Sequence, residues 1–162
     1  MNKQMSYKIR RLNPNEYEIL EIFLYEAIFV PEGIESPSRD IIKSPELQVY
    51  IKDFGLKDDY ALGAEIDGKI IGTVWTRIMK DYGHIDDETP SLSISVLKEY
   101  RGLKIGTELM KQMFILLKTK GYRRVSLSVQ KENYAHKMYR DLGFEIVNEN
   151  DQDYIMLIEL KE

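Results

Sequence analysis

The sequence predicts an α/β protein, α+β in the sense that its sheet is mixed, with six to seven strands in one central sheet and helices on both faces. Two observations predict this class. Residues 91–96 alternate as a strand, pass through a basic turn into a long amphipathic helix, and are followed by another strand at residues 123–129. Such an order implies a parallel pair with a right-handed crossover. The dipeptide Asp67-Gly68 joins two further strands and favours a tight antiparallel hairpin.

The first predicted elements are a strand and a helix. Residues 7–12 alternate weakly between apolar and polar side chains. Asn13 and Pro14 then supply a helix cap and a first-turn proline. Apolar residues recur at helical spacing over residues 14–29, and Pro31 ends this helix.

A loop, a short helix and the hairpin follow. Residues 31–45 are rich in Pro, Gly and Ser without any period, so they are predicted to form a loop. Residues 46–54 are expected to form a short second helix. The two strands of the hairpin cover residues 60–66 and 69–78, and an acidic loop covers residues 79–90.

The second half of the chain alternates strands with helices. Hydrophobic periods of two and of 3.6 residues predict these elements. They are a strand at 91–96, a helix at 105–120, a strand at 123–129, a helix at 133–142, and strands at 144–147 and 153–160.

Composition indicates one globular domain over residues 1–162, with 43% hydrophobic and 31% charged residues. The net charge of −4 argues against a nucleic-acid partner. The chain has no cysteine and no apolar run of signal-peptide or membrane-span length, so we expect a cytoplasmic protein without a membrane partner. His84 and His136 lie too far apart in sequence to suggest a metal site.

The turn before the long helix is predicted to bind phosphate. A helix N-terminus presents unpaired backbone N–H groups at the positive end of the helix dipole. Arg101 and Lys104 add positive charge, and Gly106 lets a ligand approach the backbone closely. The alternative is that both cations are merely solvated. A mononucleotide is the poorer ligand because the turn lacks the GxxxxGK[ST] spacing.

Two segments together resemble the GNAT superfamily of acyl-CoA-dependent N-acetyltransferases: RGLKIG after SISVLKEY, and NYAHKMYRDLGF about thirty residues later. The family signature is Arg or Gln, two variable residues, Gly, one variable residue, then Gly or Ala. Arg101, Lys104 and Gly106 hold its defined positions, and Lys104 departs from the usual glycine. The resemblance covers the element order of nearly the whole chain. It implies a GNAT-like acyl-CoA N-acyltransferase fold.

The resemblance also implies an activity and a cofactor. The activity is transfer of an acetyl group from acetyl-CoA to a primary amine of a small molecule or peptide, by direct attack in a ternary complex. The turn would hold the pyrophosphate of coenzyme A through Arg101, Gly102, Leu103, Lys104, Ile105, Gly106 and Thr107. Asn133 resembles the family's cofactor-contacting asparagine, although its alternative role is a helix N-cap.

Two strands carry a shared serine pattern. Apolar residues alternate with serines over residues 92–96 and 125–129. In the family these strands splay apart and the pantetheine arm pairs with backbone near the position of Val96. A backbone N–H near Val96 or Leu97 would stabilise the oxyanion. The alternative is that the serines simply lie beneath a helix.

Tyr139 is the candidate catalytic residue. By resemblance it holds the position of the tyrosine that protonates the departing thiolate of coenzyme A. A phenol with a pKa of roughly 10 can serve as that acid. The alternative is a core tyrosine with a satisfied hydroxyl, because Tyr139 lies on the apolar side of its helix.

The acceptor site is predicted less sharply. The segments that build it in this fold class supply Tyr25, Glu32 and Trp75 as candidate substrate residues, and such aromatic and acidic side chains would suit a cationic acceptor. No general base is singled out, although His84 and the acidic residues 86–88 lie in a suitable loop. A non-catalytic acyl-CoA-binding regulatory module remains the alternative function. The sequence does not fix the oligomeric state; a homodimer, the common closed assembly of soluble homo-oligomers, is compatible with it.

Overall fold

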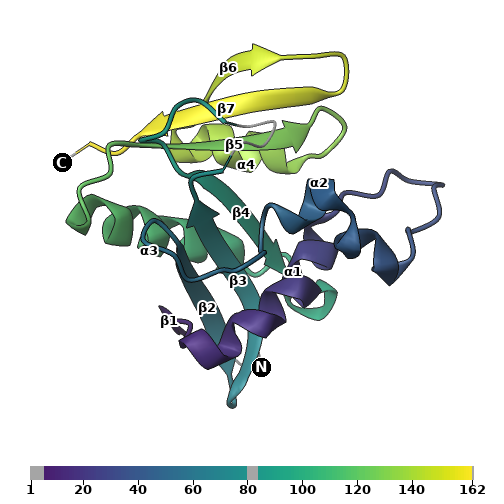
Figure 1. Ribbon diagram of the computed structural model, residues 1–162. Coiled ribbons are helices and arrows are strands. Elements are labelled where there is room, and N and C mark those ends of the chain that lie inside the picture. The colour runs from purple at the N-terminus through teal and green to yellow at the C-terminus, as the bar shows by residue number, and fades with distance from the viewer. Residues whose placement is uncertain (1–5, 80–83, 162) are drawn as a thin grey trace, which may run out of the picture.

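The computed structural model describes residues 6–79 and 84–161, which form a seven-stranded sheet flanked by helices (Figure 1). The strand order is β1-β2-β3-β4-β5-β7-β6, with β4 and β5 parallel and the other neighbours antiparallel. The strands are β1 (Lys8–Arg11), β2 (Tyr60–Ile66), β3 (Lys69–Arg77), β4 (Ser91–Val96), β5 (Arg124–Gln130), β6 (Glu145–Glu149) and β7 (Asp153–Glu159). The predicted mixed sheet is confirmed.

Helices cover both faces of the sheet, as predicted (Figure 1). One face carries α1 (Leu20–Ala27) and α2 (Pro45–Gln48), and the other carries α3 (Ile105–Thr119) and α4 (Ala135–Leu142). Each face has its own core. The α1 side buries Leu20, Phe23 and Trp75, whereas the larger core on the other side centres on residues of α3 such as Leu109 and Met113.

The predicted hairpin turn is confirmed in detail. Asp67 and Gly68 both have positive φ angles, of 49° and 81°, between β2 and β3. Two central residues with positive φ define the turn whose twist matches the right-handed twist of the flanking strands.

The first half of the chain departs from prediction in three places. The helix expected over residues 14–29 begins as a 3-10 helix, η1 (Pro14–Ile19), before α1 starts. The segment expected to be a loop contains a further 3-10 helix, η2 (Arg39–Lys43). The second helix is only four residues long, because its chain continues as turns toward Gly55. Short 3-10 segments make few regular bonds, so hydrophobic periodicity does not reveal them.

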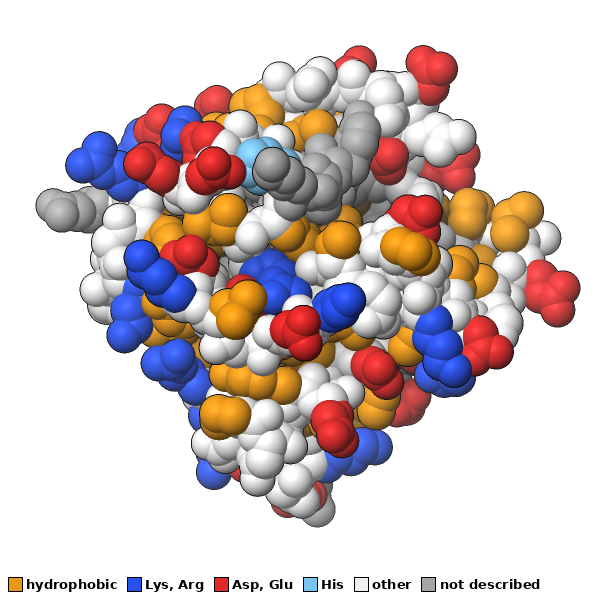
Figure 2. Space-filling view, viewed as in Figure 1, with side chains coloured by type: hydrophobic (Ala, Val, Ile, Leu, Met, Phe, Trp, Pro, Cys, Tyr) orange, Lys and Arg blue, Asp and Glu red, His pale blue; other side chains and the backbone are white. Residues whose placement is uncertain are grey.

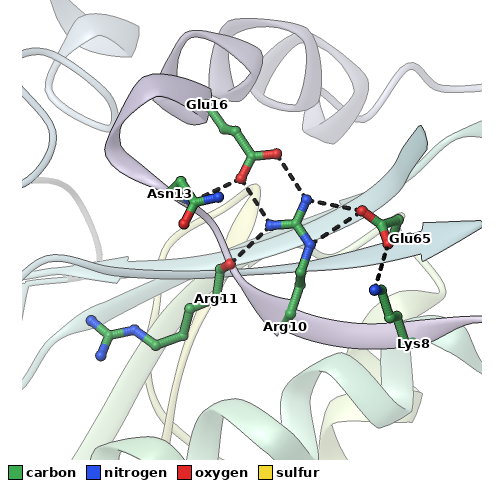
Figure 3. Close-up of polar contacts among 6 residues, drawn as sticks. All are labelled: Lys8, Arg10, Arg11, Asn13, Glu16 and Glu65. Carbon is green, nitrogen blue, oxygen red and sulfur yellow. Dashed lines mark hydrogen bonds and ion pairs between the residues drawn. The ribbon is translucent and has the colours of Figure 1, made fainter. Parts of the chain in front are cut away.

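A charged network ties β1, η1 and β2 together (Figure 3). Arg10 donates to Glu16 at 2.8 and 2.9 Å and to Glu65 at 3.0 and 3.2 Å. Glu16 also accepts the N–H of Asn13 at 2.8 Å, which completes a capping box at the start of η1. Hydrogen bonds from Arg10, together with this N–H, lower the pKa of Glu16 to about 2. Arg10 is therefore the residue that joins the first strand to the first helical turn.

A buried ion pair anchors the segment before β2. The Arg77 guanidinium contacts the Asp59 carboxylate at 3.0 and 3.2 Å, with both side chains less than 10% exposed. Arg77 also donates to the backbone carbonyls of Val49 and Lys52. Such pairs are stable only when the remaining donors and acceptors are satisfied, and here they are.

Strands β4 and β5 meet at one end and then separate. Among the described residues their ladder consists of the pair Ser91–Ser126, and the N–H of Ser126 also bonds to the carbonyl of Pro90 at 3.0 Å. Beyond this point the two strands diverge, as the resemblance implied. In the part of the chain that the structure covers, no helix is both long and apolar enough to cross a membrane.

Candidate functional site

A cavity of about 870 Å³ opens where β4 ends. One wall is the turn from Leu97 to Thr107 together with the starts of α3 and α4. The opposite wall is the C-terminal end of α1 and the segment after it. These walls bring together most of the predicted cofactor residues: Val96, Leu97, Arg101, Gly102, Lys104, Ile105, Gly106, Thr107 and Asn133. Leu103 does not line the cavity, and its side chain is 47% exposed.

The turn presents a row of unpaired backbone donors. The N–H of Arg101 bonds to Lys98, and the N–H of Glu108 bonds to the carbonyl of Lys104. Between them, within the described residues, no group accepts a hydrogen bond from the N–H groups of residues 102–107. Residues 102–104 are exposed and residues 105–107 are buried or half-buried, and such unpaired N–H groups at a helix N-terminus are suited to an anion.

Two residues give the turn its shape. Gly102 and Lys104 have positive φ angles of 80° and 64°. A left-handed conformation costs a lysine roughly 1–2 kcal/mol and a glycine almost nothing. The backbone at position 104 therefore explains why the family signature has glycine there, and this chain carries strain at that point.

Gly106 is not required by the fold. A Cβ built on this residue would meet Ile94 at 3.7 Å, an ordinary van der Waals contact, and its φ is not positive. The protein itself therefore leaves room for a side chain here. A glycine at this place, at the second position of α3, is best explained by a group that lies against it in the cavity.

The edge of β4 that faces the gap consists of alternate residues. The N–H of Leu97 bonds to the carbonyl of Ile71 in β3 at 2.9 Å, so the backbone groups of Val96 and Ile94 point away from β3. This corrects one expectation. Leu97 lines the cavity, but its N–H is already used within the sheet and is not free for an oxyanion. Of the two predicted donors, only Val96 directs its N–H toward the gap.

Arg101 is held within the protein rather than extended into the cavity. Its Nε donates to the carbonyl of Val96 at 2.8 Å, and its Nη2 lies 3.4 Å from both the carbonyl and a carboxylate oxygen of Glu26. The side chain thus links the end of β4 to the end of α1. Arg101 also lines the cavity, and its contact with phosphate stays a prediction.

Asn133 has the capping contact considered for it, and its contact with the cofactor stays a prediction. Its Oδ1 accepts the N–H of Ala135 at 2.9 Å, which caps the start of α4, and the residue also lines the cavity. Ser95 belongs to the alternating serine pattern, for which one alternative was a position beneath a helix. It donates to the carbonyl of Phe23 at 2.6 Å, so this serine lies beneath a helix.

Tyr139 lies behind the cavity wall. It is 8% exposed, its ring contacts Phe144 edge-on at 5.9 Å, and it is not among the lining residues, whereas Ala135 and Met138 of the same helix are. Burial raises the pKa of its phenol to about 12. In the described part of the chain its hydroxyl has no hydrogen-bond partner. The catalytic assignment of Tyr139 remains a prediction.

The three expected acceptor residues are not brought together. Tyr25 lines the cavity and donates to the carbonyl of Pro37 at 2.5 Å. Glu32 is exposed outside the cavity. Trp75 is wrong as a ligand contact, because it is 1% exposed in the core beneath α1 and its Nε1 donates to the carbonyl of Tyr50 at 3.1 Å. An aromatic residue on a strand is as often core as site, and the sequence offered no way to choose.

The loop before β4 is engaged in its own contacts. His84 lies 3.2 Å from Asp87, and Asp86 pairs with Arg124 at 2.6 Å. The neighbouring Thr89 and the N–H of Glu88, which donates to Asp86 at 2.8 Å, lower the pKa of Asp86. None of these residues lines the cavity, and residues 80–83 of the loop lie outside the described part. Nor, over residues 6–79 and 84–161, do three or more potential ligands gather for a metal ion.

Sequence reasoning missed the residues that the α1–α2 segment brings to the cavity. Phe29, Ser36, Pro37 and Arg39 all line it. They lie in a stretch without period, and only the fold reveals which of its side chains face the ligand. Arg39 lies two residues after Pro37 in this stretch, and that position alone did not mark it as a site residue.

Comparison with known proteins places the fold and the family. The acetyltransferase (GNAT) family model matches residues 24–144. Two proteins named probable N-acetyltransferase camello, from Xenopus tropicalis and Xenopus laevis, are 37% and 33% identical over 82 residues. That match covers 50% of this chain but only 36% of each relative, so the chain spans well under two thirds of their length.

Solved structures agree with these matches. A PaiA N-acetyltransferase from Thermoplasma acidophilum, in complex with coenzyme A, is 26% identical, with a TM-score of 0.71 over 96% of this chain and 99% of that one. A GNAT acetyltransferase from Staphylococcus aureus superposes with a TM-score of 0.72 at 20% identity, covering 96% of this chain and 100% of that one. The family model covers well over half of the sequence, and the chain therefore belongs to the acetyltransferase (GNAT) family.

Proposed function

We propose that this chain transfers an acetyl group from acetyl-CoA to a primary amine. The observation that carries the proposal is the row of unpaired N–H groups over residues 102–107, in one cavity with the divergent edge of β4. The row suits a pyrophosphate, and the strand edge suits the amide groups of a pantetheine arm. Gly106 supports the same assignment, since the fold leaves room for a side chain there and a bound group would give a reason for its absence.

The protein's part in the reaction is to hold and orient the two substrates. Acetyl-CoA supplies the thioester carbon that the amine attacks, so a C–N bond forms and the C–S bond breaks. The Val96 N–H is placed to stabilise negative charge on the carbonyl oxygen. The amine gives up one proton and the thiolate takes one. Tyr139 is the proposed donor to the thiolate, and its raised pKa keeps the phenol protonated at neutral pH.

A second function is a non-catalytic acyl-CoA-binding module. One observation favours it: Tyr139 lies behind the cavity wall, while its neighbours Ala135 and Met138 line the cavity. A module of this kind would bind coenzyme A as the enzyme does. It would form no acetylated product with any amine.

Two measurements test the proposal. In a thermal-shift titration, coenzyme A at 100 times its dissociation constant should stabilise the protein by about 2.7 kcal/mol. Pantetheine, which lacks the pyrophosphate, should give a much smaller shift at equal concentration. Product formation with an amine panel then separates the enzyme from the binding module.

A charge variant and its control sharpen the binding test. Replacing Lys104 with Gln removes a cation from the cavity, whereas Lys111→Gln makes the same change further along α3, away from it. Coenzyme A affinity should fall for the first variant and stay unchanged for the second. An equal response to coenzyme A and to pantetheine would contradict the pyrophosphate assignment.

A further inference from the structure

Arg39 is a cation at the cavity that has no partner of opposite charge within residues 6–79 and 84–161. Its guanidinium lies over the ring of Tyr25, 4.6 Å from the ring centre, and it lines the cavity. Among the described residues no carboxylate lies within ion-pair distance of it. The neighbouring Asp40 pairs with Lys43 instead, at 3.5 Å.

The geometry leaves the hydrogen-bonding edge of Arg39 available. Arg39 is exposed, and a guanidinium in cation–π contact with a ring keeps N–H groups that can donate to a ligand. Tyr25 is itself fixed, because its hydroxyl donates to the carbonyl of Pro37 two residues before Arg39. The ring, the carbonyl and the guanidinium thus form one preorganised unit on the α1 side of the cavity.

Arg39 lies across the cavity from the pyrophosphate turn. Ser95 of β4 bonds to α1 on one face of the sheet, whereas Val96 packs with α3 on the other. Arg39 and Tyr25 belong to the α1 side, and Lys104 and the row of N–H groups belong to the α3 side. Arg39 thus lines the cavity from a different segment than the turn and can serve a second anion.

The charges around the cavity point the same way. Arg39, Lys98, Arg101 and Lys104 line it with the carboxylates of Glu26 and Glu99, so cations outnumber carboxylates. On the face that carries α1 and α2, acidic and basic side chains are interspersed and no broad acidic patch appears (Figure 2). The cationic acceptor suggested by Tyr25, Glu32 and Trp75 loses its basis, because Trp75 is buried, Glu32 lies outside, and Tyr25 already holds a cation.

We infer that the acceptor is an amine that also carries a carboxylate, and that Arg39, stacked on Tyr25, binds this carboxylate. The inference rests on the proposed acetyl transfer and names its substrate class. A guanidinium edge matches a carboxylate with two parallel hydrogen bonds. Holding the carboxylate on the α1 side would direct the amine of the same molecule toward the β4 edge, where the thioester is proposed to lie.

The test compares matched pairs of amines that differ only in the carboxylate. α-, β- and γ-amino acids and short peptides are assayed beside the corresponding alkylamines and peptide amides. The wild type should favour the carboxylate member at least tenfold in kcat/KM. Arg39→Gln should remove that preference through KM, and Arg39→Glu should reverse it toward the alkylamines. Lys43→Gln, on the same 3-10 helix but outside the cavity, should retain it.

Three results would overturn the inference. The first is equal rates within every pair, and the second is an unchanged preference in Arg39→Gln. The third is a loss of affinity for coenzyme A, and not for the acceptor, in Arg39→Gln; this result would assign Arg39 to a phosphate of the coenzyme. If no pair member is acetylated, a thermal-shift assay measures binding of the amino acids to the complex of the protein with coenzyme A. A shift that is the same in the wild type and in Arg39→Gln would also overturn the inference. Failure of the proposed function is distinct, because the wild type would then not bind coenzyme A or would acetylate no amine of any class.

Discussion

Replacing Lys104 with Gly should stabilise the protein and weaken coenzyme A binding at the same time. Lys104 has a φ of +64°, which costs a residue with a Cβ roughly 1–2 kcal/mol. Glycine removes that cost but loses about 0.5–1 kcal/mol through its freer unfolded chain. The net gain is about 0.5–1 kcal/mol, or a rise in Tm of about 1–4 °C for a chain of this size.

The opposite effect on binding comes from the lost ammonium. Lys104 is exposed, so its pairing with a phosphate is worth up to about 1 kcal/mol, or about fivefold in affinity. Denaturation scans and coenzyme A titrations measure the two effects separately. Lys104→Ala is the matched control, because it loses the same charge but keeps the strained backbone, so it should share the affinity loss without the gain in Tm. A Tm for Lys104→Gly at or below that of Lys104→Ala would refute the reasoning.

Three further predictions follow from the contacts described above. Tyr139→Phe should lower kcat about 100-fold while its affinity for coenzyme A, measured by titration, is kept; an unchanged kcat in this variant would remove Tyr139 as the acid. Because burial raises the pKa of Tyr139 to about 12, the wild-type kcat should show no loss from phenol ionisation up to about pH 10. The pKa of Glu16 is lowered from 4.5 to about 2, so its contribution to stability is present above pH 4.5 and lost as the pH falls through 2. Urea denaturation at several pH values should accordingly show a shallower acid loss for Glu16→Gln than for the wild type, and equal slopes would contradict this. Asp59→Asn leaves the buried Arg77 uncompensated and should cost about 3–5 kcal/mol of unfolding free energy, whereas a cost below 1 kcal/mol in the same assay would show that the carbonyls of Val49 and Lys52 suffice for Arg77.

The fold was largely predictable because its signals are local. The Asp67-Gly68 turn, the alternation in β4 and β5 and the apolar stripe of α3 each fix one element, and a strand–helix–strand order fixes the parallel pair. The α1–α2 region was not predictable in the same way. Individual hydrogen bonds hold this region, such as the one that the Gln48 side chain donates to the carbonyl of Ile42 at 2.7 Å. Such contacts leave no periodic pattern of apolar residues in the sequence.

The cofactor side of the site was more predictable than the acceptor side for the same reason. The turn and the start of α3 are contiguous in sequence, so their donors could be placed from the sequence alone. The acceptor side depends on which of several loop residues turns inward. Arg39 does and Glu32 does not, and that difference is decided by packing against Tyr25 rather than by residue type.

The single strand pair between β4 and β5 has a mechanical consequence. The seven-stranded sheet has two parts, one of β1 to β4 and one of β5, β7 and β6, and among the described residues backbone pairing joins them at one end of β4 and β5. The first part of the sheet rests on α3, whose buried Met113 lies against β3 with its Sδ 4.0 Å from Thr76, so the packing of this layer bears on the position of β3 and β4. A change of one methylene in that layer, distant from any ligand, should alter the width of the gap and hence the turnover of the enzyme.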